Sequence, residues 1–209
     1  MYWRALSLVQ EPPYLPIKAT SGYNITERKT RTLSIKKIVV IGPESTGKST
    51  LSAALAAALH TVWVPEYARA YLESLGRPYE EHDLLAMAQG QLRAEDEIIN
   101  QANQYLICDT DLNVIKVWSE NTYGHCNREI LEQIAQRKYD LYLLTNIDIP
   151  WEDDPLREHS SPELRNYFYN QYKDIVMNSG VPWIDISGDH EERVKSAVTA
   201  IKLIEPLSN

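Results

Sequence analysis

Residues 42–49 read Gly-Pro-Glu-Ser-Thr-Gly-Lys-Ser, a complete match to the phosphate-binding pattern G-x-x-x-x-G-K-[ST]. The β-branched run 38–41 precedes this segment, and apolar residues at helical spacing follow it from Leu51 to Leu59. Because the motif works as the turn between a strand and a helix, its position in the chain supports its usual chemistry. The sequence therefore predicts a binding site for a nucleoside triphosphate.

Each residue type in this loop has a physical role. Gly42 and Gly47 let main-chain N–H groups turn toward a polyanion, and the field of the following helix N-terminus adds to them. Lys48 places a mobile charge near the β- and γ-phosphates, and the Ser49 hydroxyl is the expected ligand of Mg²⁺. We therefore expect ATP and Mg²⁺ as cofactors, and the loop contributes these ATP-binding residues: Gly42, Glu44, Ser45, Thr46, Gly47, Lys48, Ser49 and Thr50.

Composition limits the class of protein and its partners. A net charge of −8 and a pI near 5.2 argue against a nucleic-acid partner, because phosphate backbones are bound by clustered lysines and arginines. No apolar stretch approaches the roughly 20 residues of a membrane-spanning helix, and the N-terminus does not suit a signal peptide. We expect a cytoplasmic protein with a small-molecule substrate and no membrane partner. The sequence does not indicate the oligomeric state.

The chain divides into an N-terminal extension, residues 1–35, and one α/β domain, residues 36–209. The extension contains prolines and tyrosines without a sustained period. In the domain, helical patterns alternate with apolar runs, which predicts a P-loop NTPase with a parallel five-stranded sheet and helices on both faces. The expected strands are 36–41, 61–65, 104–109, 141–144 and 181–186. The expected helices include one from Tyr67 to Gly76, one over 82–103, and a last one capped by Asp189 and Glu192.

The residues after each strand indicate the second half of the site, because ligands of open parallel sheets bind beyond the carboxyl ends of the strands. Asp109 ends an apolar run, where a carboxylate beside the Ser49-bound Mg²⁺ would complete the metal shell. Asp111 is a candidate substrate-binding residue, with an ordinary helix cap as the alternative.

Glu66, Tyr67 and Arg69 follow the second expected strand, across the cleft from the phosphate loop. Glu66 could accept a proton from a substrate hydroxyl or bind a ribose, and Arg69 could contact a phosphate or pair with Glu66. Tyr67 is a further candidate for substrate binding. Since Glu66 and Asp109 both end strands that face one cleft, either could be the base.

The segment after the fourth strand is typical of a small lid. It begins Pro-Trp-Glu-Asp-Asp-Pro-Leu-Arg at residue 150, and such a loop can fold over the γ-phosphate and exclude water. Arg157 is the candidate that would stabilise charge in the transition state. Trp151 could stack on a substrate ring or hold the base of the lid, and Ser187 follows the last strand, where adenine is expected.

Four motifs together resemble the ribosylnicotinamide kinase domain of NadR-type proteins, over about residues 36–205. They are Gly-Pro-Glu-Ser-Thr-Gly-Lys-Ser-Thr (42–50), Glu-Tyr-Ala-Arg-x-Tyr-Leu (66–72), Cys-Asp-Thr-Asp (108–111) and Pro-Trp-x-x-Asp-x-Leu-Arg (150–157). The resemblance implies a nucleotide-kinase fold and ATP-dependent phosphorylation of the 5′-hydroxyl of nicotinamide riboside, which gives nicotinamide mononucleotide for NAD biosynthesis.

NadR-type proteins often carry a nucleotidyltransferase domain and sometimes a DNA-binding domain before the kinase, and residues 1–35 are too few for either. We therefore expect only the kinase step here. Two alternatives remain open at this point. One is a P-loop ATPase that acts as a nucleotide-dependent regulator without a small-molecule acceptor, and the other is a kinase for a different nucleoside or nucleotide.

Overall fold

The computed structural model describes residues 34–204, so the predicted extension falls almost entirely outside the described residues. Within the described part, the strands form one parallel sheet in the order β2-β3-β1-β4-β5, which confirms the five-stranded prediction. The second and last strands are shorter than predicted. The bounds are β1 (Lys36–Ile41), β2 (Val62–Val64), β3 (Tyr105–Asp109), β4 (Leu141–Thr145) and β5 (Trp183–Ile186).

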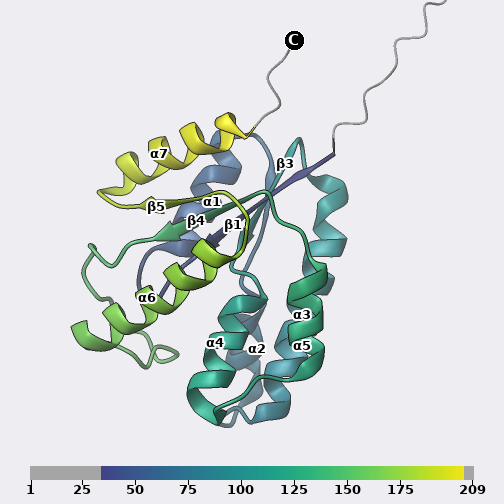
Figure 1. Cartoon of the computed structure of the whole chain (residues 1–209), viewed down its shortest axis with the longest axis vertical. Helices are drawn as coiled ribbons and strands as arrows, with labels where there is room; N and C mark the ends of the chain where they lie inside the picture. Colours follow the sequence, from purple (N-terminus) through teal and green to yellow (C-terminus); the bar gives the residue numbers. More distant parts are fainter. Residues whose placement is uncertain (1–33, 205–209) are drawn as a thin grey trace, which may run out of the picture. The chain divides into compact units, whose positions relative to one another are not determined.

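Helices follow every strand of the sheet (Figure 1). The helix expected over 82–103 ends at Ile98 and continues as a 3₁₀ turn, Ile99–Gln101, because the chain must reverse through Gln104, at φ 68°, to enter β3. The predicted capping of the last helix by Asp189 and Glu192 is confirmed. The helices are α1 (Lys48–Ala58), α2 (Tyr67–Leu75), α3 (Glu81–Ile98), α4 (Leu112–Tyr123), α5 (Arg128–Gln136), α6 (Pro162–Asn178) and α7 (His190–Leu203).

Both faces of the sheet are covered, as the continuous apolar run of β1 predicts. Ile38 and Val40 pack with α1 and α7 on one face, while Val39 and Ile41 pack with α4 and α6 on the other. A smaller core lies away from the sheet, among α2, α3, α4 and α5, which gather in the lower part of Figure 1. Within residues 34–204, no helix is both long and apolar enough to span a bilayer.

The strand register determines where the site forms. Val40 of β1 is paired with Asp109 of β3, and Ile41 is paired with Leu144 of β4, one residue before Thr145. The carboxyl ends of these three strands therefore meet at one edge of the sheet. The phosphate loop leaves the sheet at that edge and leads directly into α1.

Candidate active site

The phosphate loop is shaped by its glycines and by β4. Gly42 has φ 153°, and a Cβ there would lie 2.3 Å from Thr145 Oγ1, so a side chain is excluded at this position. Gly47 adopts a left-handed conformation, φ 77°, immediately before α1. The Thr46 hydroxyl lies 2.8 Å from the Pro43 carbonyl oxygen and 2.7 Å from Thr145 Oγ1. The loop is thus held by hydrogen bonds within itself and to the end of β4.

A cavity of about 330 Å³ lies over this loop. Its volume is in the range of small-molecule sites. The cavity brings together most of the predicted site residues, namely Gly42, Glu44, Ser45, Thr46, Gly47, Lys48, Ser49, Thr50, Glu66, Arg69 and Arg157. Its apolar wall includes Leu72, Val114, Trp118, Leu156 and Tyr172. The loop and the residues that follow β2 therefore face one space, as predicted.

Asp109 lies at the base of this site with its carboxylate buried, and only 1% of the residue is exposed. Neither of its oxygens accepts a hydrogen bond of normal geometry within the described residues. Burial raises the pKa of this carboxyl, while the neighbouring Ser49 hydroxyl and the Lys48 ammonium act in the opposite direction. A buried carboxylate with unfilled acceptor capacity beside a hydroxyl fits Mg²⁺ or its bound water.

The protein supplies few ligands for such an ion. No group of three or more His, Cys, Asp or Glu residues that could hold a metal occurs within residues 34–204. Mg²⁺ commonly binds through one or two protein oxygens and completes its shell with waters and substrate phosphates. Ser49 and Asp109 are suited to that mode of binding, and phosphate oxygens would have to supply further ligands.

Glu66 precedes the first residue of α2 and lines the cavity. Burial raises the pKa of its carboxyl, the Lys48 ammonium lowers it, and the Asp109 carboxylate raises it. Arg69 forms ion pairs with Glu73 and Asp154, at 3.3 and 2.6 Å, rather than with Glu66. Glu66 belongs to no ion pair formed among the described residues, and its carboxylate is available to a ligand.

The lid, residues 150–160, lies against the phosphate loop. The Arg157 guanidinium is 3.4 Å from Ser45 Oγ and also donates to the Glu152 carbonyl. Arg165, at the start of α6, donates to the carbonyls of Ile149 and Ser45, at 3.0 and 3.3 Å. Arg157 therefore points into the cavity over the phosphate loop, whereas Arg165 fixes the chain at the base of the lid.

Five predicted site residues lie outside the cavity lining: Asp109, Asp111, Trp151, Tyr67 and Ser187. Asp111 accepts hydrogen bonds from the Asn113 main chain at 3.0 Å and from the Tyr142 hydroxyl at 2.7 Å. Burial raises the pKa of Asp111 to about 6. Asp111 is therefore a buried cap of α4. The cap was the alternative to a substrate-binding role in the sequence-based prediction. Trp151 lies 6.0 Å from both the Arg157 and Arg165 guanidinium groups, so it packs at the lid base.

Tyr67 and Ser187 are also outside the lining. The Tyr67 main chain donates to Gln91 Oε1 at 2.8 Å, and its ring packs on Gly90 of α3. Ser187 is exposed after β5. The geometry thus gives Tyr67 a packing role between α2 and α3.

This packing leads to a prediction about stability. A Cβ at Gly90 would lie 2.0 Å from the Tyr67 ring, so Gly90→Ala should destabilise the fold by about 1–3 kcal/mol, although alanine favours a helix. In a Tyr67→Ala background, the same substitution should be neutral or stabilising. Chemical denaturation of the four proteins of this double-mutant cycle measures the difference. Equal effects of Gly90→Ala in both backgrounds would show that the ring does not pack here.

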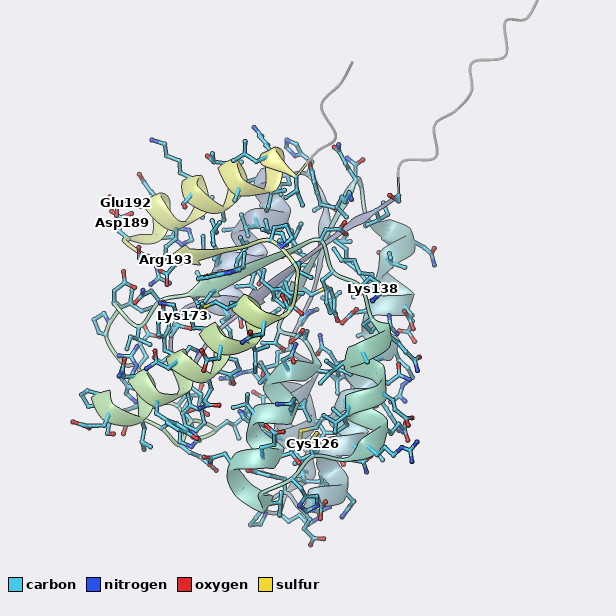
Figure 2. The ribbon with its side chains drawn as sticks, viewed as in Figure 1. Cys126, Lys138, Lys173, Asp189, Glu192 and Arg193 are labelled. Atoms are coloured by element: carbon cyan, nitrogen blue, oxygen red, sulfur yellow. The ribbon has the colours of Figure 1, made fainter. Side chains whose placement is uncertain are left out.

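Arg193 of α7 is a site residue that was not predicted from the sequence. Arg193 is buried, donates to the Thr46 carbonyl at 2.8 Å and to the Gly188 carbonyl at 2.9 Å, and pairs with Asp148. Figure 2 shows it at the start of α7, beside Asp189 and Glu192. Arg193 lies four and eight residues before the buried Ala197 and Ile201, so it falls on the apolar stripe of α7. This spacing could have identified it from the sequence, because a charged residue on an apolar stripe must find partners inside the fold.

A second cavity, of about 230 Å³, adjoins the first and shares Glu44, Leu72, Trp118 and Leu156 with it. The Tyr79 and Trp118 rings are stacked at its wall, with 6.5 Å between their centroids and 28° between their planes. Pro155 and Phe168 contribute further apolar surface, and Asn121 and Thr122 contribute polar groups. The arrangement suits a flat aromatic ligand with polar edges.

Comparisons with known proteins agree with this architecture. A family model described as an AAA domain matches residues 37–193. The trifunctional NAD biosynthesis/regulator proteins NadR of Salmonella typhimurium and Escherichia coli are 25% and 24% identical over 175 residues, which cover 80% of this chain. The matched region is 42% of each relative, so the chain spans about two fifths of their length.

Solved structures of NadR and of a nucleotide kinase share this fold. A NadR protein in complex with NR is 27% identical, with a TM-score of 0.64, over 84% of this chain and 54% of that one. Thymidylate kinase from Candida albicans is 13% identical, with a TM-score of 0.57, over 84% of this chain and 96% of that one, which shows the fold alone. The predicted nucleoside and nucleotide kinase fold is therefore confirmed.

Proposed function

The chain belongs to the AAA-domain family, and from that premise we propose that it is an ATP- and Mg²⁺-dependent kinase that phosphorylates the 5′-hydroxyl of a nucleoside. The proposed acceptor is nicotinamide riboside, and the product is nicotinamide mononucleotide, a step of NAD biosynthesis. The observation that carries the proposal is a cavity that a complete phosphate loop and Glu66 line together, and that adjoins an aromatic pocket. The Glu66 carboxylate forms no ion pair among the described residues.

The phosphate loop holds and orients the triphosphate in this proposal. Its main-chain N–H groups and the start of α1 bind the phosphates, and Lys48 follows the charge that develops during transfer. Mg²⁺ held by Ser49 and Asp109 would neutralise charge on the β- and γ-phosphates. Arg157 contacts the transferred group from the lid side, and the lid excludes water that would otherwise compete as acceptor.

Glu66 acts on the acceptor side. It lines the cavity opposite the loop, and no cation within residues 34–204 forms an ion pair with its carboxylate. A group in that position can orient or deprotonate a 5′-hydroxyl in line with the γ-phosphate. The base of the nucleoside would then occupy the second cavity, against the Trp118 and Tyr79 rings. A regulator without an acceptor has no use for such a pocket.

The relatives support the choice of acceptor. The two NadR relatives from Salmonella typhimurium and Escherichia coli are named for NAD biosynthesis, and one solved NadR structure contains NR, which we take to be nicotinamide riboside. This chain spans about two fifths of the curated relatives, so the proposal is limited to the kinase step and takes over neither their other activities nor their regulatory role.

An ATP-consumption screen tests the proposal. The acceptors are nicotinamide riboside, the four common ribonucleosides and their monophosphates, each with Mg²⁺. Consumption stimulated most by nicotinamide riboside is expected. Stimulation by another acceptor alone would identify a different nucleoside or nucleotide kinase, and slow consumption that no acceptor stimulates would identify a regulatory ATPase.

Glu66→Gln should impair use of the acceptor far more than binding of ATP. We expect a fall in kcat of about 10²–10⁴-fold, typical of a lost general base. The pKa of Glu66 is raised. The fraction of Glu66 in the charged form, which acts as the base, therefore increases with pH over a higher range than for an ordinary carboxyl. The kcat/KM of the wild type should therefore rise with pH across that range. If the Glu66→Gln variant shows the same rise of kcat/KM with pH as the wild type and a near-normal kcat, Glu66 is not the base.

A further inference from the structure

Glu44 is the third residue of the phosphate loop, and its carboxylate binds the lid rather than the loop. Its Oε2 atom accepts hydrogen bonds from the main-chain N–H groups of Glu158 and His159, at 3.0 and 3.1 Å. The His159 ring lies 3.5 Å from the same oxygen and packs on Phe168. Two successive N–H groups that converge on one carboxylate oxygen form a small anion-binding nest.

Ser45, the next loop residue, holds the other end of the lid. Its Oγ atom accepts a hydrogen bond from the Glu152 main chain at 2.8 Å, and the Arg157 guanidinium lies 3.4 Å from it. Two consecutive side chains of the phosphate loop therefore attach the lid at Glu152 and at Glu158, and Arg157 lies between these attachments. The position of Arg157 thus depends on both.

A carboxylate at residue 44 is not explained by binding of ATP. Like charges at close range repel, so Glu44 opposes a polyanion held by the same loop. Glu44 also lines both cavities, and it therefore lies where the two proposed substrates meet. The lid amides that hydrogen-bond to Glu44 offset part of its charge. Its contacts thus connect the loop that binds phosphate to the segment that carries Arg157.

We propose that Glu44 is a positioning residue, which fixes the lid so that Arg157 faces the transferred phosphoryl group. The inference rests on the proposed kinase function for its effect on turnover. The attachment itself depends only on the contacts of Glu44 with the lid.

Three variants test this role, with kcat, the Kd of ATP and hydrogen exchange of residues 151–160 as the measurements. Glu44→Ala removes both acceptor bonds, so kcat should fall about tenfold or more, the loss typical of a charge-assisted hydrogen bond. Its Kd for ATP should stay unchanged or decrease, because a repelling charge is gone, and the lid should exchange faster. Glu44→Gln keeps an oxygen that can accept the same N–H groups, and it should recover most of the lost kcat and the slow exchange.

Glu163→Ala is the matched control, since Glu163 is an exposed carboxylate in the first turn of α6 and does not contact the lid amides. It should behave as the wild type. Exchange in α7 reports whether each variant is folded. Lid exchange in Glu44→Ala equal to the wild type, a Gln variant as impaired as Ala, or ATP binding lost in step with kcat would each overturn the proposal.

The outcome separates this inference from the proposed function. If the wild-type protein shows no acceptor-dependent turnover, the kinase proposal fails. The exchange comparison still decides the attachment in that case, because faster lid exchange in Glu44→Ala and its recovery in Glu44→Gln would show that Glu44 holds the lid.

Discussion

Lys48→Ala is expected to lower acceptor-dependent ATP turnover by at least about 10²–10³-fold, the cost of removing a preorganised charge from a transition state. In the described structure, the Lys48 ammonium donates to the Pro43 carbonyl at 2.8 Å and contributes no ion pair to the core. Its loss should therefore cost only about 1 kcal/mol of stability. Turnover assays with saturating acceptor, together with thermal unfolding, measure both effects.

Lys116→Ala provides the control for Lys48→Ala. Lys116 lies on α4, where it pairs with Glu120 at 2.8 Å, and it is outside the lining of the first cavity. This variant should keep wild-type turnover. Near-normal activity of Lys48→Ala with every acceptor would contradict the assignment of the loop.

Asp109→Asn should weaken Mg²⁺ dependence and phosphoryl transfer with any acceptor, by about 10²-fold or more in kcat. The reason is that Asp109 is the buried carboxylate beside Ser49. Its oxygens accept no hydrogen bond of normal geometry within the described residues, which leaves them available to the ion or its water. Titration of activity with Mg²⁺ should show a higher requirement in this variant. Glu66→Gln should keep the wild-type Mg²⁺ requirement, and identical titrations for the two variants would contradict this separation of roles.

Asp109→Asn should also stabilise the fold. Burial raises the pKa of Asp109, so the charged carboxylate opposes folding, and this cost grows as pH rises from the ordinary carboxyl pKa through the raised value. Asp109→Asn should therefore raise Tm at neutral pH, and its advantage should shrink toward acidic pH. Thermal unfolding between pH 4 and 8 measures the trend. A lower Tm for the variant at neutral pH would show that the carboxylate stabilises the protein.

The features predicted from sequence are those with local causes. The β-branched run before the phosphate loop determines β1, and the motif itself determines the turn and the start of α1. Asp109 and Glu66 could be placed because parallel strands bring their carboxyl ends to one edge. Each of these predictions needs only the chain order and the geometry of a parallel sheet.

The remaining features depend on long-range packing. Asp111 resembles Asp109 in sequence, but the Tyr142 hydroxyl, from β4 two strands away in the sheet, donates to its buried carboxylate. Tyr67 lies next to Glu66, yet its ring fills the space left by Gly90 on another helix. The attachment of the lid to Glu44 joins main-chain groups more than a hundred residues away. No pattern within one segment encodes such contacts.

Identification of the product tests the central claim most directly. The wild-type protein is incubated with ATP, Mg²⁺ and nicotinamide riboside, and the products are separated and analysed by mass spectrometry and ³¹P nuclear magnetic resonance. We expect ADP and an equal amount of nicotinamide mononucleotide, with phosphorus coupled to the 5′-methylene protons. ADP and inorganic phosphate formed at the same rate with and without nicotinamide riboside, and no phosphorylated nucleoside, would contradict that claim.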